Sequence, residues 1–217
     1  MRFQLPAGVT KNYRGLFIAG TDTGVGKTIV AGLIARRLCR QKIKIGVMKP
    51  VASGSREDAR WLKRAAGVDD SINDINPVYL RRALAPWVAA GLANRKINPN
   101  RIGNIYRQLS GKYDFMVVEG AGGVMVPVTE KLYMVDLAKM FSLPVIIVAR
   151  PGLGTINHSL LTVNCLRDNG LEVLGFTFSC PGQFRRGLAE KTNPDVISKL
   201  GKIRFLGWVP YRKIWKV

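Results

Sequence analysis

The segment at residues 20–28, Gly-Thr-Asp-Thr-Gly-Val-Gly-Lys-Thr, constrains this chain more than any other. It follows an apolar run at residues 15–19 and precedes a helical pattern that begins near Lys27. A strand, a glycine-rich loop and a Gly-Lys-Thr that opens a helix are the context of a loop whose backbone N–H groups bind phosphate. In such a loop the lysine reaches the terminal phosphates and the next hydroxyl can coordinate Mg²⁺. The chain is therefore expected to bind a nucleoside triphosphate.

This loop departs from the consensus at one position. The consensus has a glycine six residues before the lysine, and here Thr21 occupies that place. Gly20 lies one residue earlier. We therefore interpret the segment as a variant phosphate-binding loop.

Apolar runs and helical patterns alternate along the chain. The apolar runs are typical of buried strands and cover residues 15–19, 44–48, 115–118, 144–149, 173–178 and 203–206. Helical patterns cover residues 27–41, 135–141 and 156–168. Residues 58–110 are expected to be rich in helix, with interruptions at Asn76-Pro77 and Asn98-Pro99.

The strands read as continuous apolar runs rather than alternating ones, which indicates burial on both faces. Strands of this kind that alternate with helices form a parallel sheet covered by helices on both faces. We therefore expect an α/β fold with a mostly parallel sheet, as one domain over residues 1–217 with a short basic tail at 211–217. In open sheets of this class, ligands bind beyond the carboxyl ends of the strands, where all the unusual motifs lie.

Composition limits the class of protein. With 47% apolar residues the chain can bury a full core, but no apolar stretch approaches the ~20 residues that a membrane span needs. The first residues lack the apolar segment of a signal peptide, so a cytoplasmic location is expected. Cys39, Cys165 and Cys180 lie far apart, which argues against a disulfide framework and a zinc site of known spacing. Cys39 and Cys165 fall within helical patterns and are expected in the core.

The formal net charge of +20 is unusual for a chain of this length. A field of this sign attracts polyanions such as nucleic acid or acidic membrane. The basic residues are scattered as pairs, such as Arg36-Arg37 and Arg81-Arg82, and the sequence has no motif of a nucleic-acid-binding module. We interpret the charge as a solvated basic surface and expect no nucleic-acid or membrane partner, although binding of a polyanion stays open.

Two charged residues lie near the ends of apolar strands, and a third, Asp58, opens the helix that follows Ser53-Gly54. Glu119 ends the run at 115–118, where an isolated buried carboxylate would be costly, and a metal ion bound to phosphate would offset that cost. Asp58 is a second candidate metal ligand, but the helix dipole also explains an acidic residue in a first helical turn. Lys49 can stabilise charge on a transferring phosphoryl group, or be a surface lysine beside a turn proline.

Five segments, in this order, resemble one known family. They are residues 20–28, Lys49-Pro-Val-Ala-Ser-Gly54, Val118-Glu-Gly-Ala-Gly-Gly123, Leu143-Pro-Val-Ile-Ile-Val148 and Gly154-x-x-Asn157-His158. Their order and spacing are similar to those of dethiobiotin synthetase, a family of the P-loop NTPase superfamily, from about residue 15 to about residue 210. Asn76-Pro77 and Ala85-Pro86 resemble a further segment of that family.

The resemblance implies an activity. It is that of an ATP-dependent cyclo-ligase, which converts 7,8-diaminononanoate, CO₂ and MgATP into dethiobiotin, ADP and phosphate through a carbamate and a carbamic-phosphoric anhydride. Mg²⁺ and ATP are the implied cofactors, and a homodimer is the implied assembly. The candidate residues are consistent with this reaction, because cations, carboxylates and backbone N–H groups can position the substrates and stabilise the charge of phosphoryl transfer.

The resemblance also assigns roles to residues of this sequence. The implied catalytic residues are Lys49, Lys27 and Thr23, and the implied Mg²⁺ ligands are Thr28, Asp58 and Glu119. The diamine is expected at Ser53, Glu119, Gly122, Gly154 and Asn157, with the start of the helix at 154–157 receiving its carboxylate across the dimer interface. The nucleotide is expected at Asp22, Thr23, Gly24, Val25, Gly26, Lys27, Thr28, Ser179 and Pro210.

Two departures from the family pattern concern specificity. Ser179 and Cys180 stand where the family typically has an Asn-Asp pair that reads the nucleotide base, so we expect looser base selectivity. The loop at residues 54–57 is short, which would alter how the diamine is covered. His158, the single histidine, is expected to be structural because the implied chemistry needs no histidine base.

Two other functions compete with this interpretation. A related ATP-dependent amidase that activates a carboxylate predicts an amidotransferase domain or partner, and the sequence has no cysteine nucleophile motif. A ParA/MinD-like ATPase switch on DNA or membrane would suit the charge of +20. Such switches usually carry a second lysine early in the phosphate loop, where this chain has Thr21 or Asp22.

Overall fold

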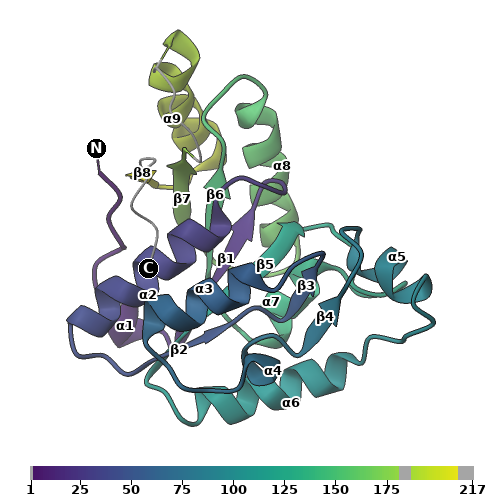
Figure 1. Cartoon of the computed structure of the whole chain (residues 1–217). Helices are drawn as coiled ribbons and strands as arrows, with labels where there is room; N and C mark the ends of the chain where they lie inside the picture. The colour runs from purple at the N-terminus through teal and green to yellow at the C-terminus, as the bar shows by residue number, and fades with distance from the viewer. Residues whose placement is uncertain (1, 181–186, 210–217) are drawn as a thin grey trace.

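The computed structural model describes residues 2–180 and 187–209, and a parallel sheet lies at its centre (Figure 1). The six strands of this sheet follow the order β2-β5-β1-β6-β7-β8. They are β1 (Gly15–Gly20), β2 (Ile45–Met48), β5 (Phe115–Gly123), β6 (Val145–Ala149), β7 (Val173–Ser179) and β8 (Phe205–Val209). All five pairings between neighbouring strands are parallel, which confirms the expected fold class.

Helices cover both faces of the sheet. One face carries α2 (Lys27–Arg40) and α3 (Glu57–Ala66), while α6 (Pro99–Ser110), α7 (Met134–Met140), α8 (Thr155–Asp168) and α9 (Leu188–Gly201) contribute to the core of the other. Successive residues of β1 alternate between the two cores, with Phe17 in one and Ile18 in the other. Because both neighbours are apolar and buried, the strand reads as a continuous apolar run.

Local signals explain where the main helices begin. Gly26 precedes α2 with a φ of 92°, a left-handed conformation that favours glycine. Asn98 caps α6, because its side chain accepts hydrogen bonds from the backbone N–H groups of Asn100 and Arg101, and Pro99 takes the first helical position. The Asn98-Pro99 pair therefore starts a helix.

The prediction for residues 58–110 was incomplete. This region contains α4 (Ile72–Ile75), α5 (Pro86–Gly91) and the strand β4 (Val78–Leu80), which pairs in parallel with β3 (Val51–Ser53) as a separate small sheet. Strands of three residues are too short to show a periodic pattern. The helices α1 (Val9–Asn12) and α9 were not predicted, β8 begins two residues later than predicted, and β5 continues through its glycines to Gly123.

The cysteines differ in burial. Cys180 is buried, whereas Cys39 and Cys165 are half-buried at the edges of the cores rather than inside them as expected. Within the described ranges, every helix falls short of the length and hydrophobicity that crossing a bilayer would take.

We predict that Gly32→Ala destabilises the contact between α2 and α3. A Cβ at Gly32 would lie 1.5 Å from the ring of Trp61, so the two helices would have to separate. Overpacking of this kind costs about 1–3 kcal/mol, which urea denaturation would measure. Gly91→Ala, where the new Cβ meets open space, is the control. Equal free energies of unfolding for the two variants would contradict the prediction.

Candidate active site

The phosphate-binding loop connects β1 to α2, and its conformation requires glycine. Gly24 and Gly26 have φ values of 73° and 92°. A Cβ at Gly26 would lie only 2.2 Å from Oγ of Ser179, at the end of β7. Strand β7 therefore supports the loop from behind, and the loop packs too closely for any side chain at Gly26.

Lys27 is the first buried cation of the site. Its side chain is almost fully buried, and its ammonium donates a hydrogen bond to the backbone oxygen of Asp22 at 2.8 Å. Burial, together with repulsion from Lys49, lowers the pKa of Lys27 to about 8. The charged ammonium of Lys27 is thus held in a buried position, which is energetically costly. A bound anion such as phosphate would offset that cost.

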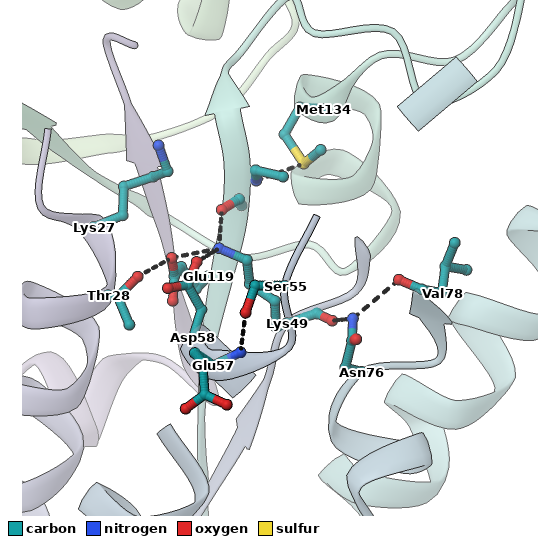
Figure 2. A network of polar contacts seen from close by, with 12 residues as sticks. Lys27, Thr28, Lys49, Ser55, Glu57, Asp58, Asn76, Val78, Glu119 and Met134 are labelled. Carbon is teal, nitrogen blue, oxygen red and sulfur yellow. Dashed lines mark hydrogen bonds and ion pairs between the residues drawn. The ribbon is translucent and has the colours of Figure 1, made fainter. Parts of the chain in front are cut away.

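Lys49 is the second buried cation and forms the centre of a polar network (Figure 2). Its ammonium lies 2.5 Å from Oε1 of Glu119 and 3.0 Å from Oδ2 of Asp58, and it donates to the backbone oxygen of Gly120. Burial alone would lower the pKa of Lys49, but the two carboxylates beside it raise that pKa. Lys49 is therefore a fixed positive charge at the carboxyl edge of the sheet.

Thr28, Asp58 and Glu119 meet at the same corner. The hydroxyl of Thr28 donates to Oε1 of Glu119 at 2.7 Å, and Asp58 reaches this corner through Lys49. Oε2 of Glu119 is buried without a hydrogen-bond partner, and burial raises the pKa of this carboxyl group, while Lys49 opposes the rise. A hydroxyl, a half-exposed carboxylate and an unsatisfied buried carboxylate oxygen are hard oxygen donors, which fit Mg²⁺.

A cavity of about 730 Å³ joins these groups. The phosphate loop and the polar corner form one part of its wall, and apolar side chains at residues 83–86 and at Val126 form another. Gly122 belongs to the wall with a φ of 63°, and a Cβ there would lie 2.6 Å from Val126. Ser53 also lines the cavity, and its Oγ is buried without a hydrogen-bond partner.

The structure brings most, but not all, of the predicted site residues to this cavity. Its lining includes Thr23, Gly24, Gly26, Lys27, Thr28, Lys49, Ser53, Asp58, Glu119 and Gly122. Asp22 and Val25 belong to the same loop without lining the cavity. Gly154 and Asn157 are exposed at the start of α8 and do not line it either. Pro210 lies outside the described residues.

Ser179 and Cys180 are both buried at the end of β7. Ser179 lies behind Gly26, as the short distance to the Gly26 Cβ position shows, and Cys180 donates its backbone N–H to the oxygen of Val209. The sequence had suggested Ser179 as a contact to the nucleotide. Its side chain lies against the phosphate loop at Gly26, and a contact between Ser179 and the nucleotide stays a prediction.

Sequence reasoning missed part of the cavity wall. Trp61 and Arg64 of α3 line the cavity together with Asp58, and residues 83–86 form its apolar part. The helical spacing from Asp58 to Trp61 places both on one face of α3, which was a usable signal. Ala85-Pro86 had been noticed only as a resemblance.

Comparisons with known proteins show which proteins this chain is similar to. A family model described as an AAA domain matches residues 14–215. The chain is 40% identical over 206 residues to the ATP-dependent dethiobiotin synthetase BioD of Methanocaldococcus jannaschii, covering 93% of this chain and 96% of that protein. The protein with the same name from Thermodesulfovibrio yellowstonii is 39% identical, with coverages of 91% and 88%. The one from Aquifex aeolicus is 40% identical, with coverages of 87% and 86%.

Solved structures show the same fold at much lower sequence identity. A ParA family ATPase from Chlorobium tepidum superposes with a TM-score of 0.58 at 16% identity, covering 92% of this chain and 84% of that one. The septum site-determining protein MinD of Pyrococcus horikoshii, solved with Mg-ADP, gives 0.56 at 20% identity, with coverages of 91% and 81%. At these identities the likeness extends to the fold alone.

We predict that the affinity for ATP falls as the pH rises through about 8. Protonated Lys27 attracts the phosphates, and the neutral amine formed above a pKa of about 8 does not. The dissociation constant should therefore rise by up to about tenfold per pH unit above 8. Calorimetric titrations from about pH 7 to about pH 9.5 would measure this. Lys27→Arg keeps its charge throughout this range, so the same slope in both proteins would contradict the assignment.

Proposed function

The chain belongs to the family of ATP-dependent dethiobiotin synthetases, and we propose that its cavity performs their reaction with the residues described above. The substrates are 7,8-diaminononanoate, CO₂ and ATP, and the products are dethiobiotin, ADP and phosphate. One observation carries the proposal: the phosphate loop, Lys49 and the apolar wall at 83–86 all line one cavity. A phosphoryl donor and the alkyl chain of a diamine can therefore lie next to each other.

The reaction requires three bond changes, each with a defined leaving group. One amine of the diamine adds to CO₂ and loses a proton, which gives a carbamate. A carbamate oxygen then attacks the γ-phosphorus of ATP, and ADP leaves. The second amine attacks the carbamate carbon and loses a proton, phosphate leaves and the cyclic urea closes. Negative charge builds up on oxygen in the second step, so buried cations are the main requirement.

Lys27 and Lys49 supply these cations. Lys27 follows the glycines of the loop and would contact the terminal phosphates, as lysines of such loops do. Lys49 is held by Asp58 and Glu119 at the edge of the same cavity, where it would stabilise the carbamate and the phosphoryl group in transfer. Backbone N–H groups of the loop and Thr23 would bind the remaining phosphate oxygens.

Thr28, Asp58 and Glu119 would hold magnesium. The cation, when bound, neutralises charge on the phosphates and helps to orient them. The unsatisfied Oε2 of Glu119 supports this assignment, because a buried carboxylate oxygen without a partner costs energy until a cation binds it.

The diamine would bind between Ser53 and the apolar wall. The unpartnered Oγ of Ser53 can accept a hydrogen bond from an amine, and Glu119 lines the same cavity. Residues 83–86 and Val126 offer apolar surface for an alkyl chain. Because Gly122 has no side chain, Val126 can approach the backbone of the cavity wall closely at this position.

We predict that ADP release by this chain depends on both diamine and bicarbonate, and that Lys49→Met lowers kcat by about 10²–10³-fold, as the loss of one group that stabilises developing charge does. The KM for ATP should change little, because the phosphate loop is intact. Coupled ADP release and product mass are the measurements. Lys139→Met, an exposed lysine on α7, is the control. A response that ignores diamine would refute the function.

We further propose that the active form is a homodimer. Gly154 and Asn157 are exposed and do not line their own chain's cavity, so a carboxylate bound there would come from the site of a second copy. Leu153 and Leu161 flank them with 91% and 61% of their surface exposed. Leu84 in the cavity wall and Met125 next to that wall are also exposed, and such apolar residues favour an interface.

We predict that Leu161→Glu weakens the dimer and raises the KM for the diamine, because a charge at an apolar interface is costly. Sedimentation equilibrium would give the dissociation constant and steady-state kinetics the KM. Leu200→Glu on α9 changes a leucine with 62% exposure and should leave both values unchanged. A fully monomeric parent chain with normal activity would overturn the dimer proposal.

A further inference from the structure

Asn76 is a fully buried amide that connects the site to the small sheet. Its side chain is 0% exposed, and Nδ2 donates to the backbone oxygen of Lys49 at 2.8 Å and to that of Val78 at 3.0 Å (Figure 2). The amide thus uses both of its N–H groups. One bonds to Lys49, which lies between β2 and β3, and the other bonds to Val78, the first residue of β4. Its Oδ1 has no hydrogen-bond partner. The Asn76 side chain therefore acts here only as a hydrogen-bond donor.

The backbone of Lys49 needs such a donor. Strand β2 ends at Met48, which is its last residue paired with β5, so the carbonyl of Lys49 lies beyond that ladder. On the other side, the N–H of Lys49 donates to the oxygen of Ile75 at 2.7 Å. Residues 75 and 76 therefore hold Lys49 by both of its backbone polar groups.

The same residue also anchors the start of α3. Arg56 donates from Nη2 to the backbone oxygen of Asn76 at 3.3 Å, and its guanidinium lies 4.9 Å from the ring centre of Tyr79. Arg56 is the N-cap residue of α3, and Asp58 lies in the first turn of that helix. Asn76 thus connects to the segments that carry Lys49 and Asp58, the two partners of one ion pair.

We propose that Asn76 is a positioning residue that fixes the backbone of Lys49 so that the ammonium is held at Glu119 and the phosphoryl group. This role rests on the function proposed above. A lysine has a long, flexible side chain, so a shift of its backbone moves the ammonium relative to the reacting atoms. A misplacement of about 1 Å can cost about 10²-fold in rate.

A double-mutant cycle tests this role. Asn76→Ala should lower kcat by about 10–100-fold while the dissociation constant for ATP changes by less than about twofold, since the phosphate loop is untouched. In a Lys49→Met background the same change should cost almost nothing further, because the group that Asn76 positions is gone. Full additivity of the two effects would mean that Asn76 acts only on the fold and would overturn the proposal.

Two further variants separate positioning from loss of structure. Asn169→Ala removes another amide that donates to a backbone carbonyl, that of Cys165, at the end of α8 and should leave kcat unchanged. Asn76→Asp keeps the shape but offers no N–H at neutral pH, so its kcat should fall at least as far as that of Asn76→Ala. An Asn76→Asp protein with parental kcat would overturn the proposal. Should it fail to fold, the cycle with Asn76→Ala decides.

Hydrogen exchange tests the restraint without the reaction. In Asn76→Ala, exchange should increase at residues 45–53 and stay unchanged at residues 27–40 of α2, because only the former lose a restraint. Unchanged exchange at residues 45–53 would overturn the proposal even if activity fell. If the parent chain showed no diamine-dependent ADP release while this exchange increased, the proposed function would fail and the structural restraint would stand, which distinguishes the two.

Discussion

The buried ion pair between Lys49 and Glu119 sets the conditions for the rest of the site. Removing two charges from water costs several kcal/mol per ion, and only close geometry with further hydrogen bonds offsets that cost. The sheet supplies the geometry, because Met48 pairs with Val118 and the residue that follows each of them in the chain is a member of the ion pair. Thr28, Asp58 and the oxygen of Gly120 supply the further contacts. Two apolar side chains at these buried positions would pack at a lower free-energy cost than Lys49 and Glu119. The two charges are therefore best explained by a role in the reaction.

A second consequence concerns the phosphate loop. Lys27 and Lys49 are both buried, and Lys49 contributes to the low pKa of Lys27. Two nearby cations in a low-dielectric site repel each other, and an anion bound between them removes that cost. The site is therefore prepared for phosphate before the substrate arrives. The cations are in position before negative charge develops in the transition state. Such preorganised electrostatic stabilisation usually accounts for most of the rate enhancement in phosphoryl transfer.

The sequence predicted the elements with a strong periodic signal. Long buried strands such as β6 and long helices such as α2 have such signals, and the structure confirmed both within one or two residues. The small sheet was missed because β3 and β4 are each three residues long and pair only through the fold. Asn76 was noticed in a resemblance, but its role depends on Lys49 lying 27 residues away, which no local pattern contains.

By itself, the sequence determined the chemistry that the chain carries: a phosphate loop, a lysine and carboxylates near the ends of buried strands. These follow from local rules, because a glycine-rich turn after an apolar strand has few alternatives. Tertiary structure decided which of these groups meet. It placed Asp58 and Glu119 on one ammonium, Ser179 behind Gly26, and Gly154 outside the cavity. Strand register and helix packing fix such meetings through contacts between distant residues, and a linear pattern does not encode those distances.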